Sequence, residues 1–155
     1  MRKALLFFVI ITVIFALIAC EKSTSVSVGL SADDTILAKQ SGDQWDPVNN
    51  GKFKKGETVG LVMLNVKAFK KGNDGLNWID MDVEVKDPDG KVILSEKDLL
   101  GDSGKLDLKD NIAKSPVGNF STTSSLQSGK YTIKVTVYDK IGKGYTTNSK
   151  TFDLE

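Results

Sequence analysis

The chain lacks histidine altogether, and its 155 residues include a single cysteine and three prolines. Without histidine, the commonest general base and the commonest metal ligand are both missing. No serine lies in a Gly-x-Ser-x-Gly motif, so a hydrolase-type serine nucleophile would lack both its usual turn and its usual base. We therefore expect a protein that is not an enzyme and that uses no cofactor.

The lone cysteine, Cys20, excludes an internal disulfide, which is the usual support of small exported domains. A chain of this length can bury roughly two-thirds of its unfolded surface, so a single domain can fold without such a support. The charge is nearly balanced, with 21 basic and 20 acidic residues and no basic run. Nucleic acid is therefore not an expected partner.

One long apolar run is present near the start of the chain. It follows Arg2 and Lys3 and extends from Ala4 to Ala19, interrupted only by Thr12. The run is short for a membrane span, which needs about 20 residues, but it suits the apolar region of a signal peptide. The basic start favours the cytoplasmic side, so the rest of the chain would be exported. The alternative is an uncleaved anchor helix with an incidental cysteine.

The end of this run, Leu17-Ile18-Ala19-Cys20, is followed by the polar residues Glu21, Lys22 and Ser23. It resembles the lipobox of bacterial lipoproteins, with an aliphatic residue, then a small one before the cysteine. The resemblance implies a signal peptide over residues 1–19 and a diacylglycerol on Cys20. Two or three acyl chains anchor a protein stably. We expect the domain at a cell membrane or outer membrane, facing the periplasm or the exterior.

After a Ser/Thr-rich tether with a possible first strand (20–30), the sequence alternates between apolar and polar residues, as half-buried strands do. The clearest alternations cover 79–86 and 131–138, and 145–154 predicts a terminal strand. The run 59–69 is apolar at both parities, which predicts a strand covered on both faces or one with a bulge. Weaker strand candidates are 25–30, 91–95, 106–108 and 119–125. We also expect a helical turn near 95–100 and a hairpin loop at 140–144.

This pattern predicts an all-β fold, a single antiparallel immunoglobulin-like β-sandwich of about seven to eight strands over residues 31–155, after an N-terminal signal helix. Leu126-Gln127-Ser128-Gly129-Lys130-Tyr131 resembles the tyrosine-corner segment of immunoglobulin-like and fibronectin-type domains. The resemblance implies that the Tyr131 hydroxyl bonds to nearby backbone, and it makes Trp78 the candidate core tryptophan. It concerns architecture alone, because such sandwiches host unrelated functions.

Candidate binding residues are few. Residues 31–55 form the least regular segment and predict a long loop, a favoured place for binding. Trp45 in that loop and an exposed Tyr138 are the candidate ligand-binding residues, as rings that could stack on a sugar, although packing within the fold is the favoured role for each. The acidic turn residues Asp87 and Asp89 offer oxygens to calcium, but no EF-hand spacing is present, so we expect no metal.

Three carboxylates, Asp80, Asp82 and Glu84, share one face of a predicted strand. Neighbouring members lie about 7 Å apart at the rise of a strand, a spacing that a pair of glycosidase carboxylates could use. A solvated outer face that deters edge pairing is the favoured interpretation.

We therefore expect a membrane-anchored, extracytoplasmic lipoprotein whose non-catalytic β-sandwich acts as a binding or accessory module for another cell-envelope protein. The alternative is a carbohydrate or cell-wall binding module that uses Trp45 and Tyr138. An enzyme is a distant third.

Overall fold

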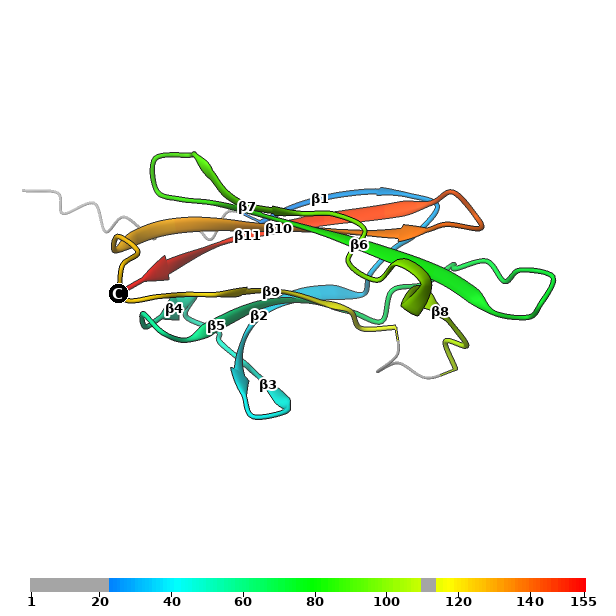
Figure 1. Cartoon of the computed structure of the whole chain (residues 1–155), viewed down its shortest axis with the longest axis horizontal. Coiled ribbons are helices and arrows are strands. Elements are labelled where there is room, and N and C mark those ends of the chain that lie inside the picture. Colours follow the sequence, from blue (N-terminus) through cyan, green and yellow to red (C-terminus); the bar gives the residue numbers. More distant parts are fainter. Residues whose placement is uncertain (1–22, 110–113) are drawn as a thin grey trace, which may run out of the picture.

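The structure, a computed structural model, describes residues 23–109 and 114–155, which form eleven strands and one 3-10 helix in two facing sheets (Figure 1). The predicted all-β sandwich is confirmed at this level. The expected signal peptide over residues 1–19 and its helix, together with Cys20, lie outside the described residues. Within the two described ranges, no helix has the length and hydropathy needed to cross a membrane.

The larger sheet has the strand order β1-β11-β10-β6-β7, with two short strands attached at its margins. Its strands are β1 (Ser23–Val28), β4 (Lys52–Phe53), β6 (Asn77–Lys86), β7 (Val92–Glu96), β8 (Lys105–Leu106), β10 (Gly129–Asp139) and β11 (Tyr145–Leu154). The three longest of these coincide with the three clearest predicted strands. All pairs are antiparallel except β4 with β11, which is parallel, so the expected purely antiparallel arrangement is corrected in this one pair.

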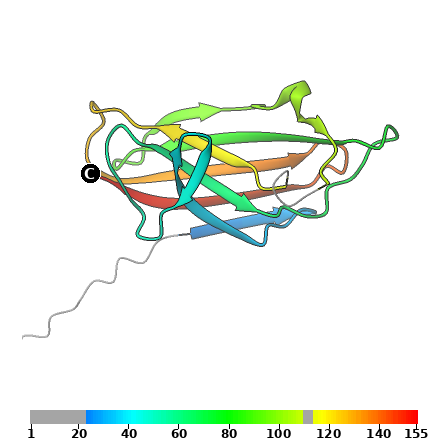
Figure 2. The same cartoon turned by 90° about the horizontal axis from the view of Figure 1, so that it is seen from below.

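The smaller sheet has the order β3-β2-β5-β9 and lies nearer the viewer in Figure 2. Its strands are β2 (Asp34–Ser41), β3 (Gln44–Pro47), β5 (Thr58–Leu64) and β9 (Val117–Ser121). The prediction of a long loop over 31–55 is wrong, because β2 pairs with both β3 and β5 and so satisfies its backbone groups within the sheet. The described strands outnumber the expected seven or eight because β2, β3 and β4 all lie in the segment that was predicted as a loop.

The core lies between the two sheets. Strand β5 contributes Val59, Leu61 and Met63 to it, while Gly60 and Val62 are buried on the opposite face. The prediction of a strand covered on both faces is confirmed for these residues, but the strand ends at Leu64 and not at 69. Strand β10 contributes Tyr131, Ile133, Val135 and Val137, all fully buried. Burial of each such side chain stabilises the fold by roughly 1.5–3 kcal/mol relative to exposure.

Trp78 does not belong to this core. It lies half-buried on β6, one residue out of phase with the core-facing Met81 and Val83, and so on the outer face of the sheet. Its Nε1 donates a 3.1 Å hydrogen bond to the carbonyl oxygen of Gly101, the first residue of the 3-10 helix (Gly101–Gly104). That helix comes a few residues later than the turn expected near 95–100. The expectation of a core tryptophan is therefore wrong.

Candidate binding site

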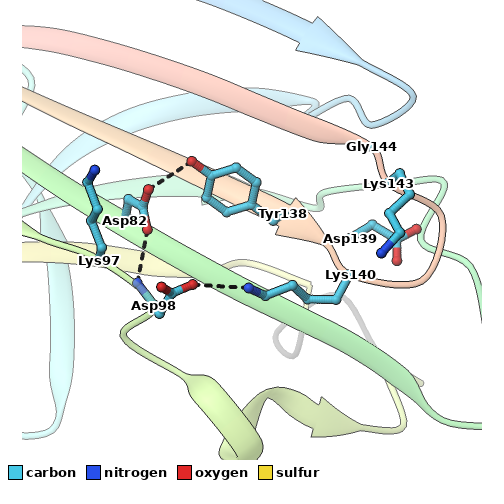
Figure 3. Close-up of a pocket in the computed structure, with 8 residues that line it drawn as sticks. All are labelled: Asp82, Lys97, Asp98, Tyr138, Asp139, Lys140, Lys143 and Gly144. Carbon is cyan, nitrogen blue, oxygen red and sulfur yellow. Dashed lines mark hydrogen bonds and ion pairs between the residues drawn. The ribbon is translucent and has the colours of Figure 1, made fainter.

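A pocket of about 280 Å³ opens on the outer face of the larger sheet, beside the β10–β11 turn (Figure 3). The strand alternation explains its position, because Tyr138 follows the core-facing Val137 and therefore points outward. The lining comes from β6, β10, the turn after β10 and the segment after β7. It consists of Asp82, Lys97, Asp98, Tyr138, Asp139, Lys140, Lys143 and Gly144.

The centre of the pocket is a fixed arrangement of Tyr138, Asp82 and Asp98. The Tyr138 hydroxyl donates a 2.8 Å hydrogen bond to Oδ2 of Asp82, and the backbone N–H of Asp98 donates one of 3.0 Å to Oδ1 (Figure 3). Asp98 has a φ of 51°, a left-handed conformation that aspartate tolerates better than most residues. Tyr138, expected to be exposed, is thus half-buried and hydrogen-bonded.

Lys140 links this centre to a buried carboxylate. Its ammonium lies 3.0 Å from Oδ1 of Asp98 and 3.1 Å from Oδ2 of Asp80. Oδ1 of Asp80 accepts hydrogen bonds from the backbone N–H groups of Met81 and Leu100. Asp80 is only 1% exposed, so the prediction of a solvated carboxylate face is wrong at this position. The segment after β7 folds back onto β6 and covers it.

The environment shifts three of these pKa values. Burial, helped by the hydrogen bond to Asp82, raises the pKa of Tyr138 to about 12, so its hydroxyl stays protonated near neutral pH. Burial alone would raise the pKa of Asp80, but the two backbone hydrogen bonds and Lys140 outweigh it and hold the pKa below its ordinary value. The hydrogen bonds to Asp98 and then Asp80 raise the pKa of Lys140.

The remaining acid of the lining is also engaged by the protein. Asp139 is buried and accepts hydrogen bonds from the backbone N–H groups of Lys70 (2.8 Å) and Ile141 (3.0 Å), which fixes the turn after β10. Lys97 and Lys143, by contrast, are exposed, and in the described part of the chain no carboxylate lies within ion-pair distance of either ammonium. The pocket therefore presents two ammonium groups to a ligand.

This arrangement suits recognition of a polar molecule. The tyrosine ring offers an apolar face, and the lysines offer hydrogen-bond donors with positive charge. Tyr145 extends the aromatic surface, with its ring centroid 6.5 Å from that of Tyr138. Across residues 23–109 and 114–155, no three histidine, cysteine, aspartate or glutamate side chains cluster closely enough to hold a metal ion.

Trp45, the other predicted ring, lies on the opposite side of the sandwich. It belongs to β3 of the smaller sheet, and its ring crosses Gly60 on β5, where an added Cβ would lie 2.5 Å from Trp45 Cζ3. The half-buried ring thus packs on the outer face of that sheet. The structure does not bring Trp45 and Tyr138 together, so they cannot form one sugar-binding platform.

Sequence reasoning singled out Tyr138 and Asp82 and missed the other six lining residues, which are Lys97, Asp98, Asp139, Lys140, Lys143 and Gly144. The turn that carries Lys143 was predicted as a hairpin loop, and that loop was the sequence feature that could have pointed to Lys143 as a binding residue. Lys97 and Asp98 had no comparable signal, because they reach the pocket only through the way the chain folds back after β7.

The fold and the pocket define an all-β sandwich domain with a surface pocket bordered by charged residues and a tyrosine. No family model matches the chain, and no curated protein matches it. Among solved structures it is similar to the crystal structure of the C-terminal domain of wzt, with a TM-score of 0.50 and 15% sequence identity. The match covers 87% of this chain and 78% of that one. At this identity the likeness shows the fold alone.

Proposed function

We propose that the chain is an extracytoplasmic binding module, anchored by lipid on Cys20, whose Tyr138 pocket takes a carbohydrate of the cell envelope. The observation that carries this proposal is the contrast within the pocket lining. Its carboxylates are engaged by hydrogen bonds or ion pairs within the protein, while the Tyr138 ring borders the pocket and Lys97 and Lys143 keep their ammonium groups available.

Preorganisation supports a binding role. The Asp82 carboxylate has both oxygens occupied, by the Tyr138 hydroxyl and the Asp98 N–H, so the ring is held before any ligand arrives. Holding polar groups in the bound geometry lowers the entropy cost of binding. The same engagement argues against catalysis, because a hydroxyl with a pKa of about 12 is a poor proton donor or acceptor at neutral pH.

The charges favour an acidic carbohydrate. A sugar ring can lie against the tyrosine, its hydroxyls can bond to the exposed Asp98 carboxylate, and a carboxylate or phosphate on the sugar can meet Lys97 or Lys143. A carbohydrate was the alternative from the sequence, and the residues of the pocket support our proposal of it as the ligand class.

The test uses the full-length chain in detergent micelles, titrated with acidic and neutral envelope polysaccharides. We expect Tyr138→Ala and Lys143→Ala each to weaken binding of the acidic polysaccharide by at least about tenfold, which corresponds to about 1.4 kcal/mol. Lys91→Ala is the matched control, since Lys91 is an exposed lysine outside the pocket, beside β7. Loss of binding on Trp45→Ala with Tyr138→Ala unchanged would move the site to the smaller sheet and contradict the proposal.

A second candidate function is attachment of another envelope protein. A groove of about 400 Å³ opens between β7 and β9 and is lined largely by apolar side chains, including Met81, Leu94, Val117 and Phe120. An apolar segment of a partner protein fits such a surface. In a pull-down from membranes, a discrete partner lost on Leu94→Asp and retained on Lys143→Ala would favour this function over the first.

A further inference from the structure

Strand β1 forms one edge of the larger sheet, and all six of its residues are exposed. It pairs with β11 on one side, and within the described residues no strand pairs with its other side. Natural edge strands are usually protected by charges, proline or a bulge. The β1 sequence, Ser-Thr-Ser-Val-Ser-Val, has no charge and no proline, and its register with β11 is unbroken.

The opposite edge of the same sheet shows the contrast. Strand β7 carries Glu96, follows Lys91 directly, and pairs with β6 through a register shift at Val85 and Lys86. Each of these features discourages a further strand from pairing there. Within the larger sheet, β1 is thus the less protected of the two edges.

We propose that β1 pairs in antiparallel fashion with β1 of a second copy of this chain, across a two-fold axis at Val26. The axis is perpendicular to the sheet, so equivalent residues of the two copies lie on the same face. Directly opposed residues must then share parity, because side chains alternate between faces along a strand. This condition leaves few registers for a strand of six residues.

The register centred on Val26 pairs β-branched residues with each other and serines with each other. It places Val26 opposite its own copy and Thr24 opposite Val28 of the second copy, so the outer face carries β-branched pairs. On the inner face it places Ser25 opposite Ser27 of the second copy. Centring on Ser25 would leave Val28 without a partner within the strand, and centring on Ser27 would shorten the ladder to three residue pairs. The Val26 register keeps five pairs and gives every outer residue from Thr24 to Val28 a partner.

The exposed side chains and the lack of charge both favour a second copy. Val26 and Val28 are 58% and 53% exposed, more than Val92 on the opposite edge at 44%. Pairing about Val26 would cover both valines. A two-fold axis near the middle of the strand brings a residue close to the same residue of the second copy, so a charged side chain there would be repelled by its equivalent. Strand β1 carries no charged side chain.

The surface area that a ladder of five residue pairs can bury is small compared with the roughly 1,000 Å² of a stable interface. Confinement to a surface raises the effective concentration of the two copies and compensates for this. This step rests on the lipid anchor at Cys20, which would lie three residues before β1. The pairing itself does not depend on the carbohydrate site.

Disulfide trapping in membranes from cells that express the full-length chain tests the proposal. Opposed Cα atoms in an antiparallel pair lie about 4.5–5.5 Å apart, within the range that a disulfide spans. We expect Val26→Cys to yield mostly a species of twice the chain mass on mild oxidation. Val92→Cys, on the other edge, is the control for random collisions, and the unsubstituted chain gives the background from Cys20.

The register is tested with two differently tagged chains. Co-expression of Ser25→Cys with Ser27→Cys should give mixed dimers, several-fold more than either variant gives alone. These positions are exposed, so the fold should be retained, and a melting curve of each variant checks this. Cross-linking of Val26→Cys no greater than that of Val92→Cys, a product of another mass, or Ser25→Cys dimers equal to the mixture would each overturn the proposal.

Discussion

The hydroxyl of Tyr131 donates a 2.8 Å hydrogen bond to the carbonyl oxygen of Gln127, four residues earlier. Tyr131 is fully buried at the start of β10, and Gln127 lies in the connection from β9, so the bond fixes the crossing from the smaller sheet to the larger one. The Tyr131 ring stacks on Phe152 at a centroid distance of 5.5 Å, which holds the hydroxyl in place.

We expect Tyr131→Phe to destabilise the fold by about 1–3 kcal/mol, because the ring packing is kept while the Gln127 carbonyl loses its donor. Urea unfolding followed by tryptophan fluorescence measures the change. Tyr145→Phe is the matched control, since its half-buried ring is retained, and it should change stability by less than about 0.5 kcal/mol. Equal effects of the two variants would show that the corner bond contributes nothing particular.

Gly118 marks a close approach between the sheets. A Cβ at this position of β9 would lie 2.2 Å from Val135 Cγ2 and 2.8 Å from Val83 Cγ2, both core side chains of the larger sheet. We expect Gly118→Ala to cost about 1–3 kcal/mol by overpacking. Asn119→Ala, at the exposed neighbouring position, should be nearly neutral in the same urea titration. A neutral Gly118→Ala would mean that the sheets separate at little cost.

The Tyr138 hydrogen bond predicts a loss of stability in alkali. Folding raises the pKa of Tyr138 from 10.0 to about 12, so its contribution is complete below pH 10 and is lost as the pH rises towards 12. This difference corresponds to at most about 3 kcal/mol. The free energy of unfolding of the wild type should therefore fall more steeply between pH 10 and 12 than that of Tyr138→Phe. Parallel curves would contradict the assigned hydrogen bond.

Asp80 is expected to be important for stability rather than for binding. Asp80→Ala would leave the N–H groups of Met81 and Leu100 without their acceptor, at a cost of about 1–3 kcal/mol per unsatisfied buried group. Because folding lowers the pKa of Asp80, its stabilisation is present above the ordinary value of 3.8 and is lost as the pH falls through the folded value. Asp43→Ala, an exposed aspartate, is the control. Thermal melting between pH 2 and 7 compares all three proteins.

The lipid anchor is tested on the membrane form. Mass spectrometry should find residue 20 as the new N-terminus and as the bearer of the lipid, and Cys20→Ser should leave the leader attached. A wild-type chain that still begins at Met1 would contradict lipidation.

The long strands could be predicted because their signal is local. In 79–86 and 131–138, alternate residues face the core, and an alternation of period two needs no knowledge of the partner strand. Strands β2 and β3 were not predicted because their strand character depends on pairing, of β2 with β5 and of β3 with β2. The alternation of 79–86 itself puts Trp78 out of phase with the core-facing Met81 and Val83, so its expected core position came from the resemblance and not from the strand pattern.

The sequence by itself determined the fold class, the tyrosine corner and the lack of histidine chemistry, since each depends on residue type and short spacing. The tertiary structure alone decided where the candidate binding residues lie. It separated Trp45 from Tyr138 onto opposite outer faces, and it brought Asp82, Asp98 and Lys140 together from three segments. It also left the uncharged strand β1 at an edge. These outcomes follow from which strands pair, and pairing is decided by contacts between residues far apart in the chain.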